Sequence, residues 1–115
     1  MTDKELLELA AKAAGISVKW DNKWNCFMRD ARPVHDEFDS EWLPWRPLTD
    51  DGDALRLAVK LSMKLYVGEA YPWNEALLDY PQKLGVCVDE DEEPDPYAAT
   101  RRAIVRAAAE IGKTL

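Results

Sequence analysis

Residues 16–28 have the sequence ISVKWDNKWNCFM, in which apolar and polar side chains alternate on both sides of a short polar segment. The alternating apolar residues are Ile16, Val18, Trp20, Trp24, Cys26 and Met28. A period of two is typical of half-buried strands, and the Asp-Asn-Lys segment at 21–23 favours a turn. The stretch therefore predicts a β-hairpin with strands at residues 16–20 and 24–28.

Three further segments have the residue spacing of amphipathic helices. Residues 3–14 follow Thr2, which forms a capping box with Glu5, and Gly15 suits the left-handed residue that ends a helix. Residues 51–62 begin with acids, whose negative charge is favourable at the positive end of a helix dipole. The apolar residues of this helix form a wide band, which predicts that other elements pack against it on more than one side. The third helix begins at Asp95 and Pro96. Its predicted inner stripe is Tyr97, Ile104, Ala108 and Ile111.

Two more segments with alternating apolar residues, 63–67 and 84–88, predict strands. Residues 29–47 and 68–83 contain prolines and have no regular period, so we interpret them as irregular loops. The order helix, hairpin, helix, strand, strand, helix predicts one α+β domain over residues 1–115. We expect a small antiparallel sheet with the three helices on its two faces, an α/β/α sandwich.

The composition is that of a globular, acidic protein. Fifteen basic and 22 acidic residues give a net charge of −7, which disfavours general binding to the phosphate backbone of nucleic acids. No apolar run approaches the roughly 20 residues of a membrane span, and the first residues lack the pattern of a signal peptide. We therefore expect a cytoplasmic protein that contacts neither nucleic acid nor membrane directly, with Cys26 and Cys87 reduced and buried on strands.

The negative charge is concentrated in two predicted loops. Residues 29–53 contain eight acids and three bases, and residues 89–95 contain six acids and no base, so the remaining chain is slightly basic. One interpretation is solubility and helix-start electrostatics. Another is an acidic face that docks on a basic partner or imitates nucleic acid. Calcium binding is a third, although Pro94 stands where the loop of an EF-hand requires its glycine.

Few residues offer catalytic chemistry. The single histidine, His35, lies in a predicted loop without a catalytic motif, and one histidine with two distant cysteines does not make a closed zinc site. A carboxylate cluster at Asp50, Asp51 and Asp53 could hold magnesium, although three acids at a helix start more often cap the helix. We predict no cofactor and no catalytic site.

Tryptophan is frequent, with five among 115 residues, and three of the five fall in predicted loops. Large rigid rings are enriched in binding hot spots, but they also cover small cores. The hypothetical anchors of a partner-binding site are Trp42, Trp45 and Trp73. The hypothetical electrostatic face beside these anchors is the acidic run Asp89, Glu90, Asp91, Glu92 and Glu93.

Two segments resemble parts of small proteins of temperate bacteriophages and prophages. They are residues 45–61, WRPLTDDGDALRLAVKL, and residues 99–112, ATRRAIVRAAAEIG. Together with the N-terminal helix and the tryptophan-rich strand region, they are similar to phage proteins of the ABA-sandwich type. The resemblance implies a sheet between helix layers and a place inside a bacterial host cell. It supplies no catalytic residues.

The charge, the aromatic residues and the implied phage context together favour an accessory protein that is not an enzyme and acts by non-covalent binding. Its expected partner is a host or phage protein with a basic surface. Inhibition of a host factor or defence system, as by anti-CRISPR and anti-restriction proteins, suits these properties. Two alternatives stay open: a metal-assisted enzyme using Asp50, Asp51 and Asp53, and a small homo-oligomeric structural or regulatory phage protein.

Overall fold

The computed structural model describes residues 1–31, 41–66, 73–78, 84–89 and 93–115. Within these ranges the elements follow one another as α1 (Asp3–Ala14), β1 (Val18–Asp21), β2 (Cys26–Asp30), β3 (Trp42–Trp45), α2 (Asp51–Lys60), β4 (Met63–Tyr66), β5 (Trp73–Leu78), β6 (Leu84–Asp89) and α3 (Pro96–Gly112). All strand pairs are antiparallel. The α+β class that the sequence predicts is confirmed.

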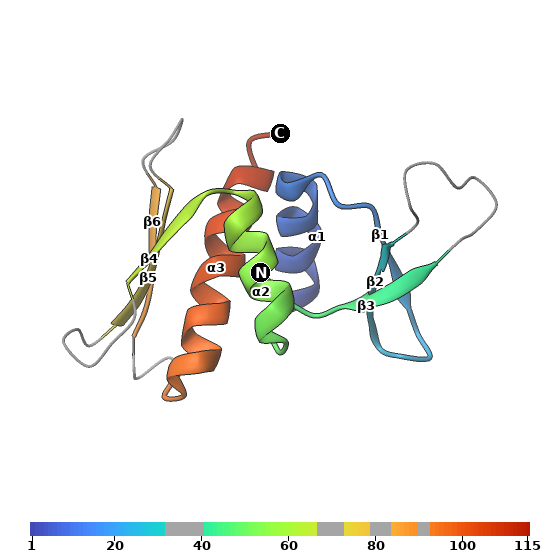
Figure 1. Cartoon of the computed structure of the whole chain (residues 1–115), viewed down its shortest axis with the longest axis horizontal. Helices are drawn as coiled ribbons and strands as arrows, with labels where there is room; N and C mark the ends of the chain where they lie inside the picture. Colours follow the sequence, from blue (N-terminus) through green and yellow to red (C-terminus); the bar gives the residue numbers. More distant parts are fainter. Residues whose placement is uncertain (32–40, 67–72, 79–83, 90–92) are drawn as a thin grey trace.

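The described strands form two sheets rather than one. Strands β1, β2 and β3 make sheet A, and strands β4, β5 and β6 make sheet B, with β2 and β5 in the central positions. The three helices lie between the two sheets (Figure 1). The expected α/β/α sandwich, with helices on both faces of a single sheet, is therefore not confirmed. Along the chain α2 separates the first three strands from the last three, and each group pairs with its own neighbours.

Helices α1 and α3 pack closely and run parallel to each other. Asp3, the first residue of α1, pairs with Arg102, and Leu9 in the middle of α1 lies against Gly112 at the end of α3. A Cβ atom at position 112 would overlap the backbone carbonyl of Leu9, so this approach requires glycine. The buried alanines of the two helices that belong to the core are Ala10, Ala11, Ala14, Ala99, Ala103, Ala107 and Ala108.

The predicted helix ends are confirmed by their caps. Thr2 Oγ1 accepts a hydrogen bond from the backbone N–H of Glu5 at 3.2 Å, and Gly15 ends α1 with a φ of 68°. Asp95 Oδ1 accepts from the backbone N–H of Tyr97 at 3.1 Å, and Pro96 occupies the first turn of α3. These side chains and this glycine satisfy backbone groups that a helix leaves unpaired at its ends.

The predicted hairpin forms two strands of sheet A, although both begin two residues later than expected. In the register of this sheet Trp20 lies opposite Phe27, and Phe27 lies opposite Trp45. The rings of Trp20 and Phe27 make an edge-to-face contact with centroids 5.1 Å apart. All three rings pack with the helices, so they form the inner face of sheet A. Cys26 is buried on β2, as predicted.

Strand β3 lies inside the segment 29–47, so the prediction of an irregular loop over this whole segment is wrong. Pro44 is the residue that misled the assignment, because proline is disfavoured in most strands. It lies opposite Met28, and β3 is an edge strand that pairs with β2 alone. An edge strand tolerates a residue without an N–H group, because one side of its backbone has no partner strand.

Sheet B confirms the two predicted strands and adds a third. Strands β4 and β6 match residues 63–67 and 84–88 to within one residue at each end. Strand β5, with the sequence WNEALL, lies in the segment 68–83 that was interpreted as a loop. This strand lacks an alternating pattern and contains residues that favour helices, so its pairing with β4 and β6 decides its structure.

The apolar stripes of the second and third helices differ partly from the prediction. In α2, Leu55 is 58% exposed and Val59 is 70% exposed, so the expected cover on a second side is absent among the described residues. In α3, Ile104 and Ala108 are buried as predicted. Tyr97 is 69% exposed, and its assignment to the inner stripe is wrong because it lies in the first turn, beyond the packed part of the helix.

Candidate functional site

The structure divides the predicted partner-binding residues between two sheets. Trp42 and Trp45 lie on β3 in sheet A. Trp73 and Asp89 face each other in the register of sheet B, on the other side of the helices (Figure 1). The predicted anchors therefore do not form one patch. The acids at 90–92 and the side chains of Trp73 and Asp89 lie outside the described part of the chain.

Trp45 does not have the exposed position that the hypothesis required. Its ring is 2% exposed and belongs to the hydrophobic core, because the alternation of β3 turns it toward Phe27 and the helices. Trp42 has the opposite orientation on the same strand and is half-buried. The Nζ of Lys19 lies 4.2 Å from the centre of its ring, which is a cation–π contact. Trp42 thus keeps a surface position, whereas Trp45 is a core residue.

Glu93 is the member of the predicted acidic face whose side chain the structure describes. It is half-buried, and its Oε1 lies 3.4 Å from the backbone N–H of Asp95, the residue that caps α3. This contact places Glu93 at the start of the helix, where a negative charge is favourable.

The aspartates before and in the first turn of α2 serve the helix start. Asp50 Oδ2 accepts a hydrogen bond from the backbone N–H of Asp53 at 2.8 Å, which confirms the capping interpretation. Asp53 is 6% exposed. It accepts from the backbone N–H of Arg46 at 2.8 Å and from Arg56 Nη2 at 2.6 Å. One backbone hydrogen bond and one charge-assisted hydrogen bond from a guanidinium therefore stabilise this buried carboxylate.

Asp51 faces a different partner, Arg101 of α3, with Oδ1 and Nη1 separated by 2.6 Å. Asp50 and Asp53 share Arg56 as an ion-pair partner, at 3.9 Å and 2.6 Å from its Nη2, whereas Asp51 pairs with Arg101. Among the residues that the structure describes, no group of three or more His, Cys, Asp or Glu side chains is placed to hold a metal ion.

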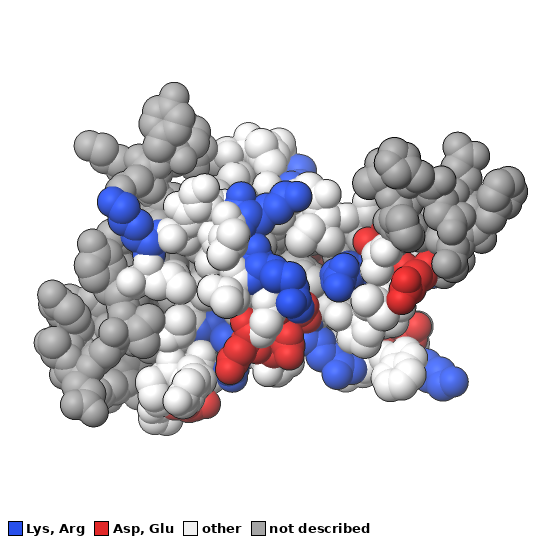
Figure 2. Space-filling view, in the orientation of Figure 1, with Lys and Arg blue, Asp and Glu red and all other residues white. Residues whose placement is uncertain are grey.

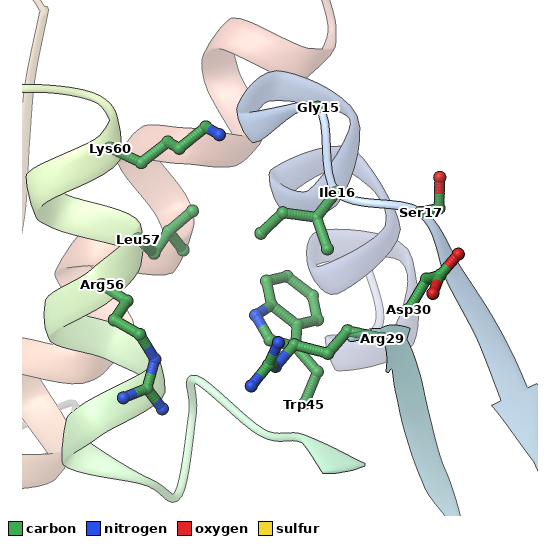
Figure 3. A pocket seen from close by; sticks show the side chains of 9 residues that line it. All are labelled: Gly15, Ile16, Ser17, Arg29, Asp30, Trp45, Arg56, Leu57 and Lys60. Atoms are coloured by element: carbon green, nitrogen blue, oxygen red, sulfur yellow. The ribbon is translucent and has the colours of Figure 1, made fainter. Parts of the chain in front are cut away.

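A pocket of about 380 Å³ lies between the end of α1, sheet A and α2. Its lining residues are Gly15, Ile16, Ser17, Arg29, Asp30, Trp45, Arg56, Leu57 and Lys60. Figure 3 shows the side chains of Arg29 and Trp45 on one wall and those of Arg56, Leu57 and Lys60 on the other. We call it the cationic pocket, because three of its residues carry positive charge.

The secondary structure explains why these cations meet. In sheet A, Arg29 lies two residues after Phe27 on β2 and therefore shares the inner face with it. In α2, Arg56 and Lys60 are four residues apart and therefore lie on the same side of the helix. Lys and Arg side chains gather over the middle of this face of the molecule (Figure 2).

Arg29 has an unusual environment in the cationic pocket. Its Nε atom is buried and has no hydrogen-bond partner among the described residues. An unpaired buried donor costs about 1–3 kcal/mol of stability. In the sequence, Arg29 is one of three bases in the predicted acidic loop 29–53 and has no other distinguishing feature. The predicted alternation took Cys26 and Met28 as the apolar face, so it gave no signal for Arg29, which shares its face with Phe27.

The outer side of α2 is a second notable surface. Asp51, Leu55 and Val59 are spaced by four residues and form one stripe along the helix. Leu55 and Val59 are exposed, and Asp51 pairs with Arg101 of α3. We call Asp51, Leu55 and Val59 the α2 stripe.

Comparison with known proteins gave no match to a family model, to a curated protein or to a solved structure. In the described ranges, no helix combines the length and the apolar character that crossing a membrane would need.

Proposed function

We propose that this chain is an accessory protein of a bacteriophage or prophage that acts by non-covalent binding to a host or phage protein with a basic surface. The α2 stripe is the observation that carries the proposal. Leu55 and Val59 are 58% and 70% exposed at neighbouring positions of one helix. Apolar side chains grouped in this way gain free energy when a partner covers them.

Charge complementarity specifies the partner. The chain has a net charge of −7, and the carboxylates of Asp50 and Asp51 are exposed at the end of α2 from which the stripe begins. A partner that carries lysine and arginine around an apolar centre matches this arrangement, because opposite charges accelerate encounter and fix orientation. The five acids of the run 89–93 and Asp95 carry further negative charge. This charge strengthens the long-range attraction between the chain and a basic partner.

Proteins that bind nucleic acid have basic surfaces of the required kind. A host factor or a defence system that acts on nucleic acid is therefore a suitable target. An acidic protein that occupies such a surface inhibits its target by competition with the nucleic acid, without any catalytic step of its own.

The experiment compares capture of bacterial proteins by the wild-type chain and by the double variant Leu55→Ser, Val59→Ser. Trp24→Ser is the matched control, because Trp24 is also exposed, at 56%, but lies in the turn of the β1–β2 hairpin. We expect a basic protein to bind the wild type and the control at low salt, to bind the double variant at least about tenfold more weakly, and to dissociate as salt rises.

Equal capture by the wild type and the double variant would contradict the role of the α2 stripe. Light scattering of the purified chain tests the self-association alternative on the same variants. A wild-type dimer that the double variant loses would assign the stripe to a second copy of the chain rather than to a basic partner.

A further inference from the structure

The cationic pocket contains a hydrogen-bond donor that the fold itself does not use. Arg29 Nε is buried there and has no partner among the described residues. Buried polar groups in folded proteins nearly always have a partner. The residues opposite Arg29 on both neighbouring strands, Val18 and Leu43, are apolar, so the sheet does not require a guanidinium at this position. An acceptor from outside the chain would complete the arrangement.

The facing wall supplies further donors. Arg56 gives one of its N–H groups to Asp53 Oδ1 at 2.6 Å, and its Nη2 also lies 3.9 Å from Asp50 Oδ2. A guanidinium carries five N–H groups, so others are available to a ligand. Lys60 adds an ammonium group one turn further along α2, and Figure 3 shows its side chain directed toward the end of α1. The carboxylate of Asp30 lies beside Ser17, at the edge of the view away from Arg56. The two arginines and the lysine therefore favour an anion between the walls.

The chemistry of the donors selects the kind of anion. Each guanidinium is a planar fork that pairs with two oxygens at once. A carboxylate offers two oxygens in one plane and suits a single fork. A phosphate monoester has three terminal oxygens that point in different directions, so it can accept from Arg29 on one wall and from Arg56 on the other.

We propose that the cationic pocket binds a small organic phosphate, whose oxygens accept hydrogen bonds from Arg29 and Arg56. The organic part of this ligand lies against the apolar lining, which Ile16, Leu57 and the edge of Trp45 provide. The volume of about 380 Å³ agrees with this class of ligand, because sites for small molecules usually measure about 300–1,000 Å³.

The test uses the full chain with phenyl phosphate, inorganic phosphate, benzoate and phenol as probes. The ¹⁵N NMR signal of Arg29 Nε is the direct reporter, and the midpoint of thermal unfolding is the second measurement. We expect phenyl phosphate to shift this signal and to raise the midpoint, inorganic phosphate to act more weakly, and phenol to have no effect. Benzoate that binds as tightly as phenyl phosphate would overturn the choice of phosphate, and an Arg29 signal that none of the probes moves would overturn the site.

Two variants separate a binding role from a structural one. Arg29→Met keeps an unbranched side chain but removes the guanidinium, so we expect unchanged or higher stability without ligand and an affinity for phenyl phosphate at least about tenfold lower. Lys60→Gln changes a pocket residue whose side chain is exposed, so it should fold; we expect it to lower the affinity about threefold, which keeps the proposal testable if Arg29→Met does not fold. Lys23→Gln in the hairpin turn is the control for loss of one charge. Unchanged affinity in both pocket variants would overturn the proposal.

This site is independent of the α2 stripe. The double variant Leu55→Ser, Val59→Ser should bind phenyl phosphate as the wild type does, because neither residue lines the pocket. Loss of phosphate binding in that variant would contradict the assignment of ligand and partner to separate surfaces.

Discussion

Asp51 Oδ1 lies 2.6 Å from Arg101 Nη1, and this ion pair joins the first turn of α2 to the beginning of α3. Arg101 also donates from Nε to the backbone carbonyl of Leu48 at 2.9 Å. Its side chain is 16% exposed, whereas that of Asp51 is 72% exposed. The arginine is thus the buried member of the pair and holds the segment before α2 as well as the helix itself.

This asymmetry predicts unequal effects of removing the two partners. Asp51→Asn should lower the free energy of unfolding by less than about 1 kcal/mol, because an exposed ion pair contributes little. Arg101→Gln should cost about 1–3 kcal/mol, because the carbonyl of Leu48 also loses its donor. Urea unfolding of both single variants and of the double variant measures the difference. A larger loss for Asp51→Asn would contradict the assignment of Arg101 as the anchoring residue.

Asp53 gives a second prediction about the start of α2. Asp53→Asn should destabilise the fold by about 1–3 kcal/mol, because the buried carboxylate accepts from both the N–H of Arg46 and Arg56 Nη2. Asp50→Asn is the matched control, since asparagine caps helices about as well as aspartate. Chemical denaturation should show a loss for the first variant and little change for the second. A reversed order would mean that capping dominates this region.

Gly112 gives a prediction about the contact between α1 and α3. Gly112→Ala should lower the free energy of unfolding by about 1–3 kcal/mol, because the added Cβ overlaps the carbonyl of Leu9 and forces the helices apart. In Gly52→Ala the new atom would meet the flexible side chain of Arg56 and the Asp50 carboxylate at 3.3 Å, so its effect should stay within about 0.5 kcal/mol. Thermal unfolding distinguishes the two variants, and equal midpoints would contradict the close approach.

The two tryptophans of β3 should differ sharply in their contribution to stability. Trp45→Ala should cost about 3–5 kcal/mol, because it removes a ring that is 2% exposed in the core. Trp42→Ala should cost about 1 kcal/mol, which reflects a half-buried ring and the cation–π contact from Lys19. Guanidinium unfolding followed by circular dichroism measures both. Similar losses would contradict the assignment of one ring to the core and the other to the surface.

The helices could be predicted from the sequence because their signals are local. Thr2 and Glu5 are three residues apart, and Asp95 with Pro96 marks a helix start that needs no distant contact. Strands β3 and β5 could not be predicted in the same way. Pro44 interrupts the residues that would indicate β3 as a strand, and β5 has no alternation of apolar and polar residues. Pairing with neighbouring strands therefore determines the strand conformation of both segments. Sheet pairing of this kind depends on residues far apart in the chain.

The candidate site was less predictable than the fold. The sequence drew attention to tryptophans and acids, yet Trp45 became part of the core and Trp73 lies with the other sheet. Arg29 and Lys60 are ordinary surface residues when only their own segments are considered. They meet because sheet A and α2 line the same pocket, and the spacing within either segment does not show which residues of the other segment lie opposite. Predicting a pocket between a sheet and a helix requires knowledge of how the two are arranged in space, and residue spacing within each segment does not provide it.

The ion pair of Asp3 with Arg102 makes the stability depend on pH in acid. The hydrogen bond from Arg102 lowers the pKa of Asp3 below its ordinary value of 3.8. Partial burial raises this pKa, but the positive charges of Arg102 and Arg106 lower it further, so the net effect is a lower pKa. A carboxyl group with a lower pKa in the folded state stabilises that state above the unfolded pKa, and this contribution disappears as pH falls through the folded pKa.

Asp3→Asn should therefore flatten the acid limb of the stability curve below about pH 4, where the wild type loses this contribution. At neutral pH the variant should be less stable by about 0.5 kcal/mol, because the side chain of Asp3 is 60% exposed and solvent screens the pair. Urea unfolding at a series of pH values measures both effects. Glu8→Gln, which removes an exposed carboxylate from the same helix, is the control. If both variants change the acid limb equally, general charge repulsion rather than the contact between α1 and α3 accounts for the slope.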